Sequence, residues 1–412
     1  DWSSDVCSSD LIAQRGAGTN EAFDRFSKLV DQWGIPVVQY WAIQLALGTD
    51  HAMHAGMDPA PLLKDADAVV VMDCLAPWSP AIHTLRDDCK VVQIGQNPLY
   101  SRFPGRNFAA DLSLCGETGD VIMMLSDAMD RRHADHAAAC LERRGKVAAM
   151  NGENRKKALA AADAGSVDPM TKAYVSRCLS DAIADRAATV FSELGCPLEP
   201  LSLSAHSSWF QEPHSGGLGW SFPASMGYQL ADKDKLVIAT MGDGSYMFAN
   251  PTACHQIAEA LELPILILVL NNNEWGAVRQ SVTGMYPNGY AAKTNEMPLT
   301  ALKPSPDFTK VAEASRAWVA KAKRAAKRRE EAGEPDDTVI EFVGITEDRV
   351  AELEAQEQFI LSVTENGFGK RTSAYEYRVS GRDGQGIIDI ETSGRNGSVV
   401  ASFPVEDSDE IM

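Results

Sequence analysis

The sequence has no apolar stretch long enough to cross a bilayer. Its longest such run, Leu261–Leu270, is interrupted by Glu262 and Pro264, whereas a membrane-spanning helix needs about 20 apolar residues in succession. Basic residues are also scarce, because 38 Lys and Arg stand against 57 Asp and Glu, a net charge of −19. Nucleic-acid binders need a basic face. The composition therefore excludes an integral membrane protein and argues against a chain that binds nucleic acid along its whole length.

Closely spaced cysteines are absent as well. The 8 cysteines include no CxxC pair and no spacing typical of a zinc site. We therefore predict free thiols in a reducing cytoplasm, most of them buried. The first residues, DWSSDVCSSDL, have neither the basic region nor the apolar region of a secretory signal, and they show no periodicity. We interpret residues 1–11 as an extraneous leader.

The rest of the chain has the composition of a globular protein. Its 412 residues are 45% apolar, enough for two to four domains. Residues 12–130 contain a periodic helix at Asn20–Trp33, capped by Thr19 or Asn20 and ended by Gly34. Strands that are apolar throughout and alternate with helices indicate a parallel sheet. The strand-like runs in this region are Ile35–Val38, Ala68–Cys74 and Val91–Ile94.

A second α/β region follows a charged segment. Residues 131–167 are rich in alanine and charge, which predicts an exposed helical linker. Residues 168–315 then contain a helix at 168–184 and two buried strands, 236–241 and 265–270. Asn250 and Pro251 open a helix between these strands, and such a crossover predicts parallel neighbours. The expected fold class is α/β, with two parallel-sheet, three-layer domains.

The end of the chain has a different character. Residues 316–337 are first basic and then acidic, which indicates a solvated linker. From residue 338 to residue 412, short alternating runs lie between turn signals, so we predict a short antiparallel β tail.

The most specific motif is Gly242-Asp243-Gly244-Ser245, which is followed after a helix by Asn271-Asn272. Both parts lie where a predicted parallel strand ends, and ligands bind at that edge of open α/β sheets. Glycines let the backbone approach a diphosphate closely. Asp243 and Asn272 offer the carboxylate and amide oxygens that suit Mg²⁺.

This motif resembles the cofactor signature of thiamine diphosphate enzymes, especially relatives of acetolactate synthase and benzoylformate decarboxylase. The upstream segment 215–227, SGGLGWSFPASMG, is similar to the segment before that signature, and residues 12–130 resemble the family's central domain. The resemblance covers about three hundred residues. It implies thiamine diphosphate and Mg²⁺ as cofactors, and a 2-oxo acid as substrate for decarboxylation or acyl transfer.

The resemblance also assigns roles to residues. It implies that Asp243 and Asn272 bind Mg²⁺ through their side chains and Glu274 through its carbonyl group. Leu218 would lie under the cofactor and impose its bent shape. The residues expected to contact the cofactor are Gly216, Gly217, Leu218, Gly242, Gly244 and Ser245. No catalytic residue is assigned.

One departure from the family bears on activity. Family members carry an N-terminal pyrimidine-binding domain with the glutamate that activates the cofactor, and nothing before Ile12 resembles it. We therefore expect an incomplete enzyme that binds Mg²⁺ and cofactor weakly and does not turn over alone. The first alternative is a competent subunit whose pyrimidine half comes from a separate chain. The expected location is the cytoplasm, and the expected partners are further copies of the chain or a chain with a pyrimidine-binding domain.

Several other residues have weaker claims. His206 and His214 flank the glycine-rich segment, where a site role and a polar loop role are equally supported. The pairs His51/His54 and His133/His136 lack further metal-type partners and favour surface or core histidines. For Trp275, core burial is favoured over packing against a cofactor.

The tail resembles a second family. Residues 359–412, with the segments ENGFGKRT and YRVSGRDGQGI, are similar to part of the DNA-wrapping C-terminal domain of the DNA gyrase A protein. The second alternative is therefore a DNA-binding module. However, residues 338–412 contain 6 Lys and Arg against 15 Asp and Glu, and this balance opposes tight binding to phosphates. No site spans both parts, so we interpret the chain as a chimera joined near residues 315–337.

Overall fold

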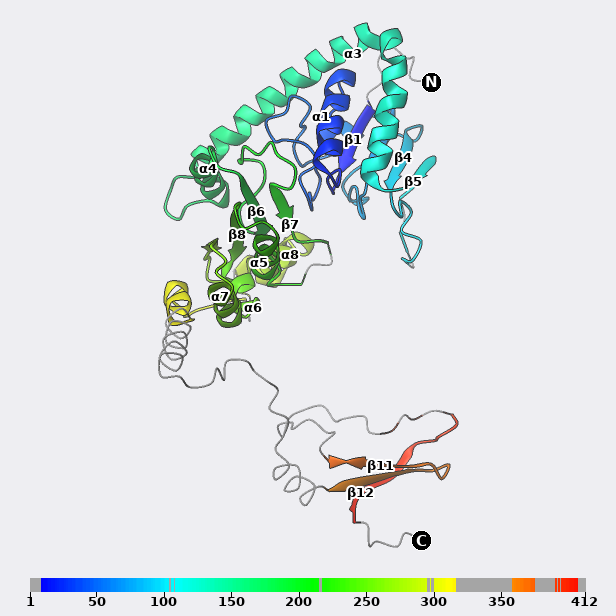
Figure 1. Ribbon diagram of the computed structural model, residues 1–412, viewed down its shortest axis with the longest axis vertical. Coiled ribbons are helices and arrows are strands. Elements are labelled where there is room, and N and C mark those ends of the chain that lie inside the picture. The colour runs from blue at the N-terminus through cyan, green and yellow to red at the C-terminus, as the bar shows by residue number, and fades with distance from the viewer. Residues whose placement is uncertain are drawn as a thin grey trace, which may run out of the picture. The chain divides into compact units, whose positions relative to one another are not determined.

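The computed structural model in Figure 1 describes most of the chain. The chain divides into two units, Asp1–Ala322 and Lys323–Met412, and each is described by itself. Within the described residues, no helix is both long enough and apolar enough to cross a membrane. The described residues are 9–103, 105–106, 108–214, 217–294, 297, 300–315, 358–374, 390, 392 and 394–406.

The first sheet has five parallel strands in the order β2-β1-β3-β4-β5, which confirms the α/β expectation for this region. Both of its faces are covered by buried apolar side chains. The elements are β1 (Ser9–Ala13), α1 (Asn20–Trp33), β2 (Val37–Val38), α2 (Ala60–Leu63), β3 (Ala68–Met72), β4 (Lys90–Gly95) and β5 (Leu112–Cys115).

Helix α1 forms as its sequence predicts. The Thr19 hydroxyl accepts a hydrogen bond from the Ala22 N–H, and Gly34 ends the helix in the left-handed region, at φ 62°. The apolar positions recur at helical spacing, and all of them face the core. The buried side chains are Ala22, Phe23, Phe26, Leu29, Val30 and Trp33.

Strand β1 begins inside the segment that the sequence suggests is an extraneous leader. Ser9, Asp10 and Leu11 pair in register with Ala68, Val69 and Val70 of β3. Strand β1 lies between β2 and β3, so it is an interior strand of the sheet. Residues 9–11, which the sequence analysis assigns to an extraneous leader, therefore belong to this sheet. Asp10 is consequently a carboxylate inside a sheet, only 2% exposed.

Helix α3 (Thr118–Asp163) is a single long helix that includes most of the segment predicted as a linker. It packs against α1 and then against α4 (Lys172–Ile183), as Figure 1 shows. Cys140 and Asn151 are buried on its inner side, so this segment contributes to the core as well as connecting the two sheets.

The second sheet has four parallel strands in the order β7-β6-β8-β9. The predicted strand–helix–strand crossover is present as β8, α7 and β9, and its strands are neighbours. Strands β6 and β7 are additional to the predicted ones. The elements are β6 (Ala188–Glu193), β7 (Trp209–Gln211), α5 (Ser221–Ala231), β8 (Leu236–Gly242), α6 (Asp243–Phe248), α7 (Pro251–Ala260), β9 (Ile265–Leu270), α8 (Gly276–Met285) and α9 (Tyr290–Thr294).

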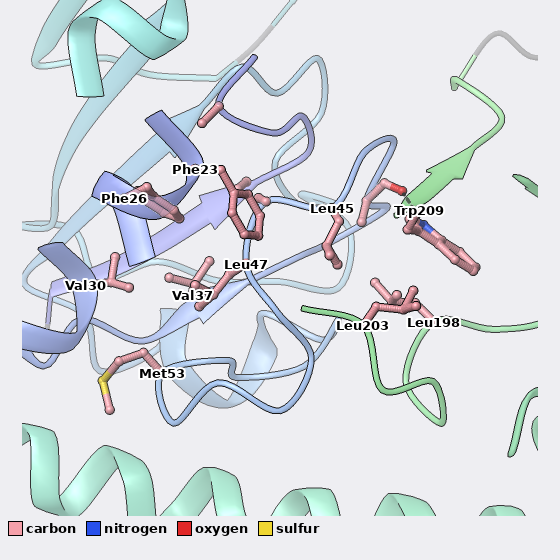
Figure 2. Close-up of a cluster of buried hydrophobic side chains, with 14 of the residues drawn as sticks. Phe23, Phe26, Val30, Val37, Leu45, Leu47, Met53, Leu198, Leu203 and Trp209 are labelled. Carbon is pink, nitrogen blue, oxygen red and sulfur yellow. Dashed lines mark hydrogen bonds between the residues drawn. The ribbon is translucent and has the colours of Figure 1, made fainter. Parts of the chain in front are cut away.

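The two sheets share one hydrophobic core. Figure 2 shows Phe23 and Leu45 from the first part in the same cluster as Leu198 and Trp209 from the second. The backbone joins them too, because the Leu45 N–H donates to the Trp209 carbonyl at 3.2 Å. The two parallel-sheet regions therefore form one unit whose parts are held in a fixed relation.

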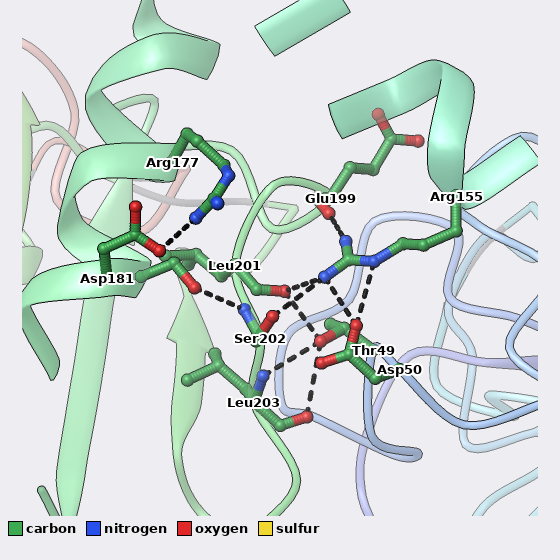
Figure 3. A network of polar contacts seen from close by, with 10 residues as sticks. Thr49, Asp50, Arg155, Arg177, Asp181, Glu199, Leu201, Ser202 and Leu203 are labelled. Carbon is green, nitrogen blue, oxygen red and sulfur yellow. Dashed lines mark hydrogen bonds and ion pairs between the residues drawn. The ribbon is translucent and has the colours of Figure 1, made fainter. Parts of the chain in front are cut away.

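Arg155 of α3 adds a polar connection between the two regions (Figure 3). Its guanidinium donates to the carbonyl groups of Glu199 and Leu201 in the second region and pairs with Asp50 of the first at 2.8 Å. Beside it, the Thr49 hydroxyl donates to the Leu201 carbonyl at 2.7 Å. One side chain thus satisfies groups on two segments that are about 150 residues apart in sequence.

We expect Arg155→Ala to destabilise the protein by about 1–3 kcal/mol, because it removes the charged donor that contacts Glu199, Leu201 and Asp50 together. The matched control is Lys156→Ala on the same helix, whose pair with Glu153 is exposed to solvent and is expected to contribute little to stability. Urea unfolding curves of the two variants measure both values. Equal stability of the two variants would contradict a joining role for Arg155.

The C-terminal unit contains a three-stranded antiparallel sheet in the order β11-β10-β12, as expected for the tail. Arg371 stacks on the Phe359 ring, with its guanidinium carbon 3.9 Å from the ring centroid. The strands are β10 (Phe359–Thr364), β11 (Gly369–Ser373) and β12 (Val399–Val405).

Candidate functional site

A pocket of about 200 Å³ lies at the carboxyl ends of β8 and β9. This is the edge where parallel α/β sheets bind ligands. Seven of the nine residues predicted for the site line it together, although the sequence distributes them over more than fifty positions. Those seven are Leu218, Gly242, Asp243, Gly244, Ser245, Asn272 and Glu274.

Asp243 provides the most buried acidic group of the pocket. It is 1% exposed, and burial raises the pKa of its carboxyl group, while the backbone N–H groups of Gly244, Asn272 and Asn273 oppose that rise. Its Oδ2 atom is buried and has no hydrogen-bond partner among the described residues. A buried carboxylate oxygen without a donor is costly. A cation would satisfy it, so this site fits a bound metal ion.

The loop after β9 places the second set of oxygen atoms. The Asn272 Oδ1 accepts a hydrogen bond from the Glu274 N–H at 3.1 Å, and the Glu274 carbonyl accepts one from the Gly276 N–H at 2.8 Å. Each oxygen keeps a second lone pair for a cation. Thr300 supports the loop from outside, since its carbonyl accepts from the Trp275 N–H at 2.7 Å.

Gly244 is needed because Trp275 packs directly against it. A Cβ atom at position 244 would lie 2.3 Å from the Trp275 ring. Trp275 itself lines the pocket and contacts Phe248, with the ring centroids 5.7 Å apart. The expectation of core burial for Trp275 is therefore wrong: the loop after β9 turns its ring toward the start of α6.

Glu193 holds the glycine-rich segment in place. Its two carboxylate oxygens accept hydrogen bonds from the N–H groups of Gly219 and Ser221, at 2.6 and 2.8 Å. Gly219 has φ 87°, and a Cβ atom there would lie 2.5 Å from the Ala249 nitrogen. Leu218, at 43% exposure, is thereby presented to the pocket.

Two predicted residues are not placed in the pocket. Gly217 is described but is not among the lining residues, and Gly216 lies outside the described residues. Sequence reasoning missed two charged residues near the site, Lys172 in the pocket and Glu193 behind the glycine-rich segment. An acidic residue that ends an apolar strand, as Glu193 ends β6, was the available signal.

The flanking histidines lie outside the pocket lining and connect the two sheet regions. His214 stacks on Trp41, with ring centroids 5.3 Å apart, and its Nε2 lies 2.7 Å from the Gln14 amide nitrogen. His206 lies 3.2 Å from the Gln44 amide nitrogen. Burial lowers the pKa of both histidines. These contacts give both histidines a structural role as polar groups between the first and second sheet regions.

The remaining candidate histidines are buried or pack against an aromatic ring. His54 is buried, and His133 and His136 lie against the Trp33 ring. Among the described residues, no group of three His, Cys, Asp or Glu side chains could hold a metal ion. The seven described cysteines are free thiols, and four of them are buried: Cys74, Cys140, Cys196 and Cys254.

Comparison with known proteins finds a similarity in the segment that contains most of this pocket. Residues 198–340 match the family described as thiamine pyrophosphate enzyme, C-terminal TPP binding domain. This part of the chain is similar to the thiamine pyrophosphate enzymes. The acetolactate synthase of Mycobacterium avium is 26% identical over 329 residues, which is 74% of this chain and 49% of that protein. The recognition made from the GDGS and asparagine motifs is confirmed.

A solved structure agrees at the level of the fold. The thiamine diphosphate-dependent 4-hydroxybenzoylformate decarboxylase of Rhodococcus jostii has a TM-score of 0.53 and 17% identity, covering 76% of this chain and 56% of that one. The chain thus spans about half the length of these two thiamine enzymes.

The tail matches a second family. Residues 358–406 match the DNA gyrase C-terminal domain, beta-propeller. The DNA gyrase A protein of Granulibacter bethesdensis is 45% identical over 100 residues, 21% of this chain and 11% of that protein. The resemblance noted in the sequence is confirmed, and it covers a small part of the gyrase protein.

Proposed function

We propose that this chain binds thiamine diphosphate and Mg²⁺ in the pocket at the carboxyl ends of β8 and β9, and that it serves a thiamine diphosphate-dependent reaction on a 2-oxo acid. Decarboxylation and acyl transfer both fit this proposal. The observation that carries it is the convergence of seven predicted residues on one pocket, with a buried carboxylate oxygen of Asp243 left for a cation. The free thiols and the family suggest a cytoplasmic homo-oligomer.

Five of the lining residues have a proposed task. Asp243 and Asn272 would hold Mg²⁺ through side-chain oxygens and Glu274 through its carbonyl group, a donor set that suits a hard cation. The diphosphate would lie along Gly244 and Ser245, where glycine at position 244 leaves room for the Trp275 ring that lines the pocket. When bound, the cofactor supplies an electron sink for carbanion chemistry.

Turnover would also require the part of the active site that binds the pyrimidine end of the cofactor, called the second half-site below. In the family resemblance, the activating glutamate belongs to a pyrimidine-binding domain. We assign the first sheet to the family's central region instead, and most strands of the second sheet lie in the segment similar to the C-terminal TPP binding domain. We propose that this half-site is contributed from outside the 412 residues, and that the 412-residue polypeptide alone binds the cofactor weakly and does not turn over. Steady release of CO₂ from a 2-oxo acid by this polypeptide alone would contradict that.

Calorimetric titration of the full chain tests cofactor binding. We expect heat of binding from thiamine diphosphate with Mg²⁺, a much smaller signal when EDTA removes the metal, and none from thiamine, because the described pocket addresses the diphosphate end. Equal binding of thiamine and thiamine diphosphate would contradict the proposal, since the acidic and glycine-rich lining would then play no part.

The gyrase-like tail gives a second candidate function, DNA binding, which the family match supports. Its net charge of −9 over residues 338–412 opposes it. Retention of duplex DNA by the full chain at low salt, lost at higher salt, would favour this candidate. We further propose that the tail was joined to an unrelated enzyme segment, which one continuous genomic read across codons 300–345 would verify.

A further inference from the structure

Lys172 occupies a position in the pocket that the sequence analysis did not assign. It is the first residue of α4, which follows the long connecting helix α3. Its ammonium group donates a hydrogen bond to the Leu194 carbonyl, directly after β6. Since β6 is the neighbour of β8, this contact fixes the ammonium group at the same carboxyl edge where Asp243 follows β8. Lys172 and Asp243 both line the pocket.

The charges around the pocket are unbalanced toward the acidic side. Lys172 is the one cationic side chain among the described residues that line it, whereas Asp243 and Glu274 are acidic. Glu212 is a further buried acid beside it, 7% exposed, with Oε2 unpartnered among the described residues. The charges of Asp243 and Glu212 both act on Lys172. An anionic ligand entering this lining would therefore meet repulsion unless cations offset it.

We propose that Lys172 is an anion-binding residue of this pocket, and that its ammonium group contacts a phosphoryl oxygen of the diphosphate end of the ligand. This inference rests on the proposed function for the identity of the whole ligand. The contact itself requires only the diphosphate group, because any pyrophosphate-type anion in the pocket would accept the same hydrogen bond from Lys172. Lys172 and a divalent cation at Asp243 then neutralise the diphosphate from two elements, α4 and the end of β8.

A purely structural role makes a different prediction. If Lys172 only ties α4 to β6 through Leu194, or only offsets Asp243 and Glu212, its loss changes stability and leaves anion affinity unaffected. If it binds the anion, its loss weakens affinity and reduces the dependence of that affinity on salt. A hydrogen bond from a charged donor contributes enough for about tenfold or more in the dissociation constant.

The test is calorimetric titration of the full chain with inorganic pyrophosphate and, separately, with thiamine diphosphate, both with Mg²⁺ and at two salt concentrations. The variants are Lys172→Met, Lys172→Arg, and Lys233→Met as a control at an exposed turn position. We expect Lys172→Met to weaken pyrophosphate binding about tenfold or more, Lys172→Arg to retain most of it, and Lys233→Met to bind like the wild type. Thermal unfolding of each variant separates lost binding from lost stability.

The outcomes distinguish the two proposals. Unchanged pyrophosphate and thiamine diphosphate binding by Lys172→Met would overturn the role of Lys172 and leave the proposed function intact. Lys172-dependent binding of pyrophosphate without any binding of thiamine diphosphate would support the anion site and contradict the proposed function. Binding of neither ligand by the wild type would overturn both.

Discussion

Replacing Asp243 with alanine is expected to weaken Mg²⁺-dependent binding of thiamine diphosphate by on the order of 100-fold or more. Removing groups that only orient a metal ligand costs about 10- to 100-fold in affinity, and Asp243 would be a ligand itself. Its carboxylate is the buried acid of the pocket. Its Oδ2 atom accepts no hydrogen bond from the described residues, so it is the oxygen that would bind the cation.

A matched control keeps this result specific. Asp234 is exposed and lies just before β8, at the opposite end of the strand from Asp243, and Asp234→Ala is expected to bind the cofactor like the wild type. Asp243→Asn should fall between the two, because an amide retains an oxygen ligand but loses the charge. Isothermal titration at fixed Mg²⁺ gives all three affinities. Wild-type affinity in Asp243→Ala would remove Asp243 from the site.

Replacing Asp10 with valine is expected to stabilise the protein by about 4 kcal/mol above pH 7. Burial between two strands raises the pKa of this carboxyl group from 3.8 to about 7, with smaller contributions from the charges of Asp65 and Asp67. A shift of that size corresponds to about 4 kcal/mol in the free energy of unfolding. Valine is apolar and β-branched, so it suits a strand with apolar neighbours on both sides.

The sign of the pH dependence follows from the raised pKa. The folded state binds more protons than the unfolded state between about pH 4 and pH 7, so the contribution of Asp10 to stability falls as the pH rises through this range. Below about pH 4 both states are protonated, and the difference disappears. Glu212, whose pKa burial raises to about 7, adds a decline of the same sign that remains in the variant.

Urea unfolding at several pH values measures this effect. Asp10→Val and the wild type should be closest in stability near pH 4 and should diverge up to pH 7, whereas Asp234→Val at an exposed turn should stay within about 0.5 kcal/mol of the wild type at each pH. A constant difference between Asp10→Val and the wild type across this range would show that Asp10 is not a buried ionisable group.

The site was the most predictable part of this chain because its residues follow short motifs at strand ends. Gly242–Ser245 and Asn272 lie at the carboxyl edge of two neighbouring strands, and the crossover helix between them makes that juxtaposition nearly obligatory. Likewise, helix α1 has a capping threonine, an apolar stripe and a terminal glycine, so local sequence alone defines its limits.

The parts that sequence could not reveal depend on contacts between distant segments. Strand β7 is only three residues long, and its pairing with β6 comes from tertiary packing around Trp209. The composition of α3 indicates a solvated linker, yet Arg155 and Asn151 connect it to loops of the two sheet regions. Charge and alanine content predict the helix but not the segments that it contacts.

Lys172 and Asp10 show the same limit at the level of single residues. Lysine at the start of a helix looks like a solvent-exposed residue, and only the fold brings it to the pocket opposite Asp243. Asp10 belongs to a stretch without periodicity, and only the position of β1 between two strands shows that it is buried. Polar residues at such positions carry no local signal, because burial is decided elsewhere in the chain.

The most direct test of the cofactor pocket is a crystal structure of the full chain grown with thiamine diphosphate and Mn²⁺ in place of Mg²⁺. We predict an anomalous difference peak between the side-chain oxygens of Asp243 and Asn272, with diphosphate density along Gly244 and Ser245. An anomalous peak elsewhere, or an empty pocket at saturating cofactor, would contradict the proposed cofactor site.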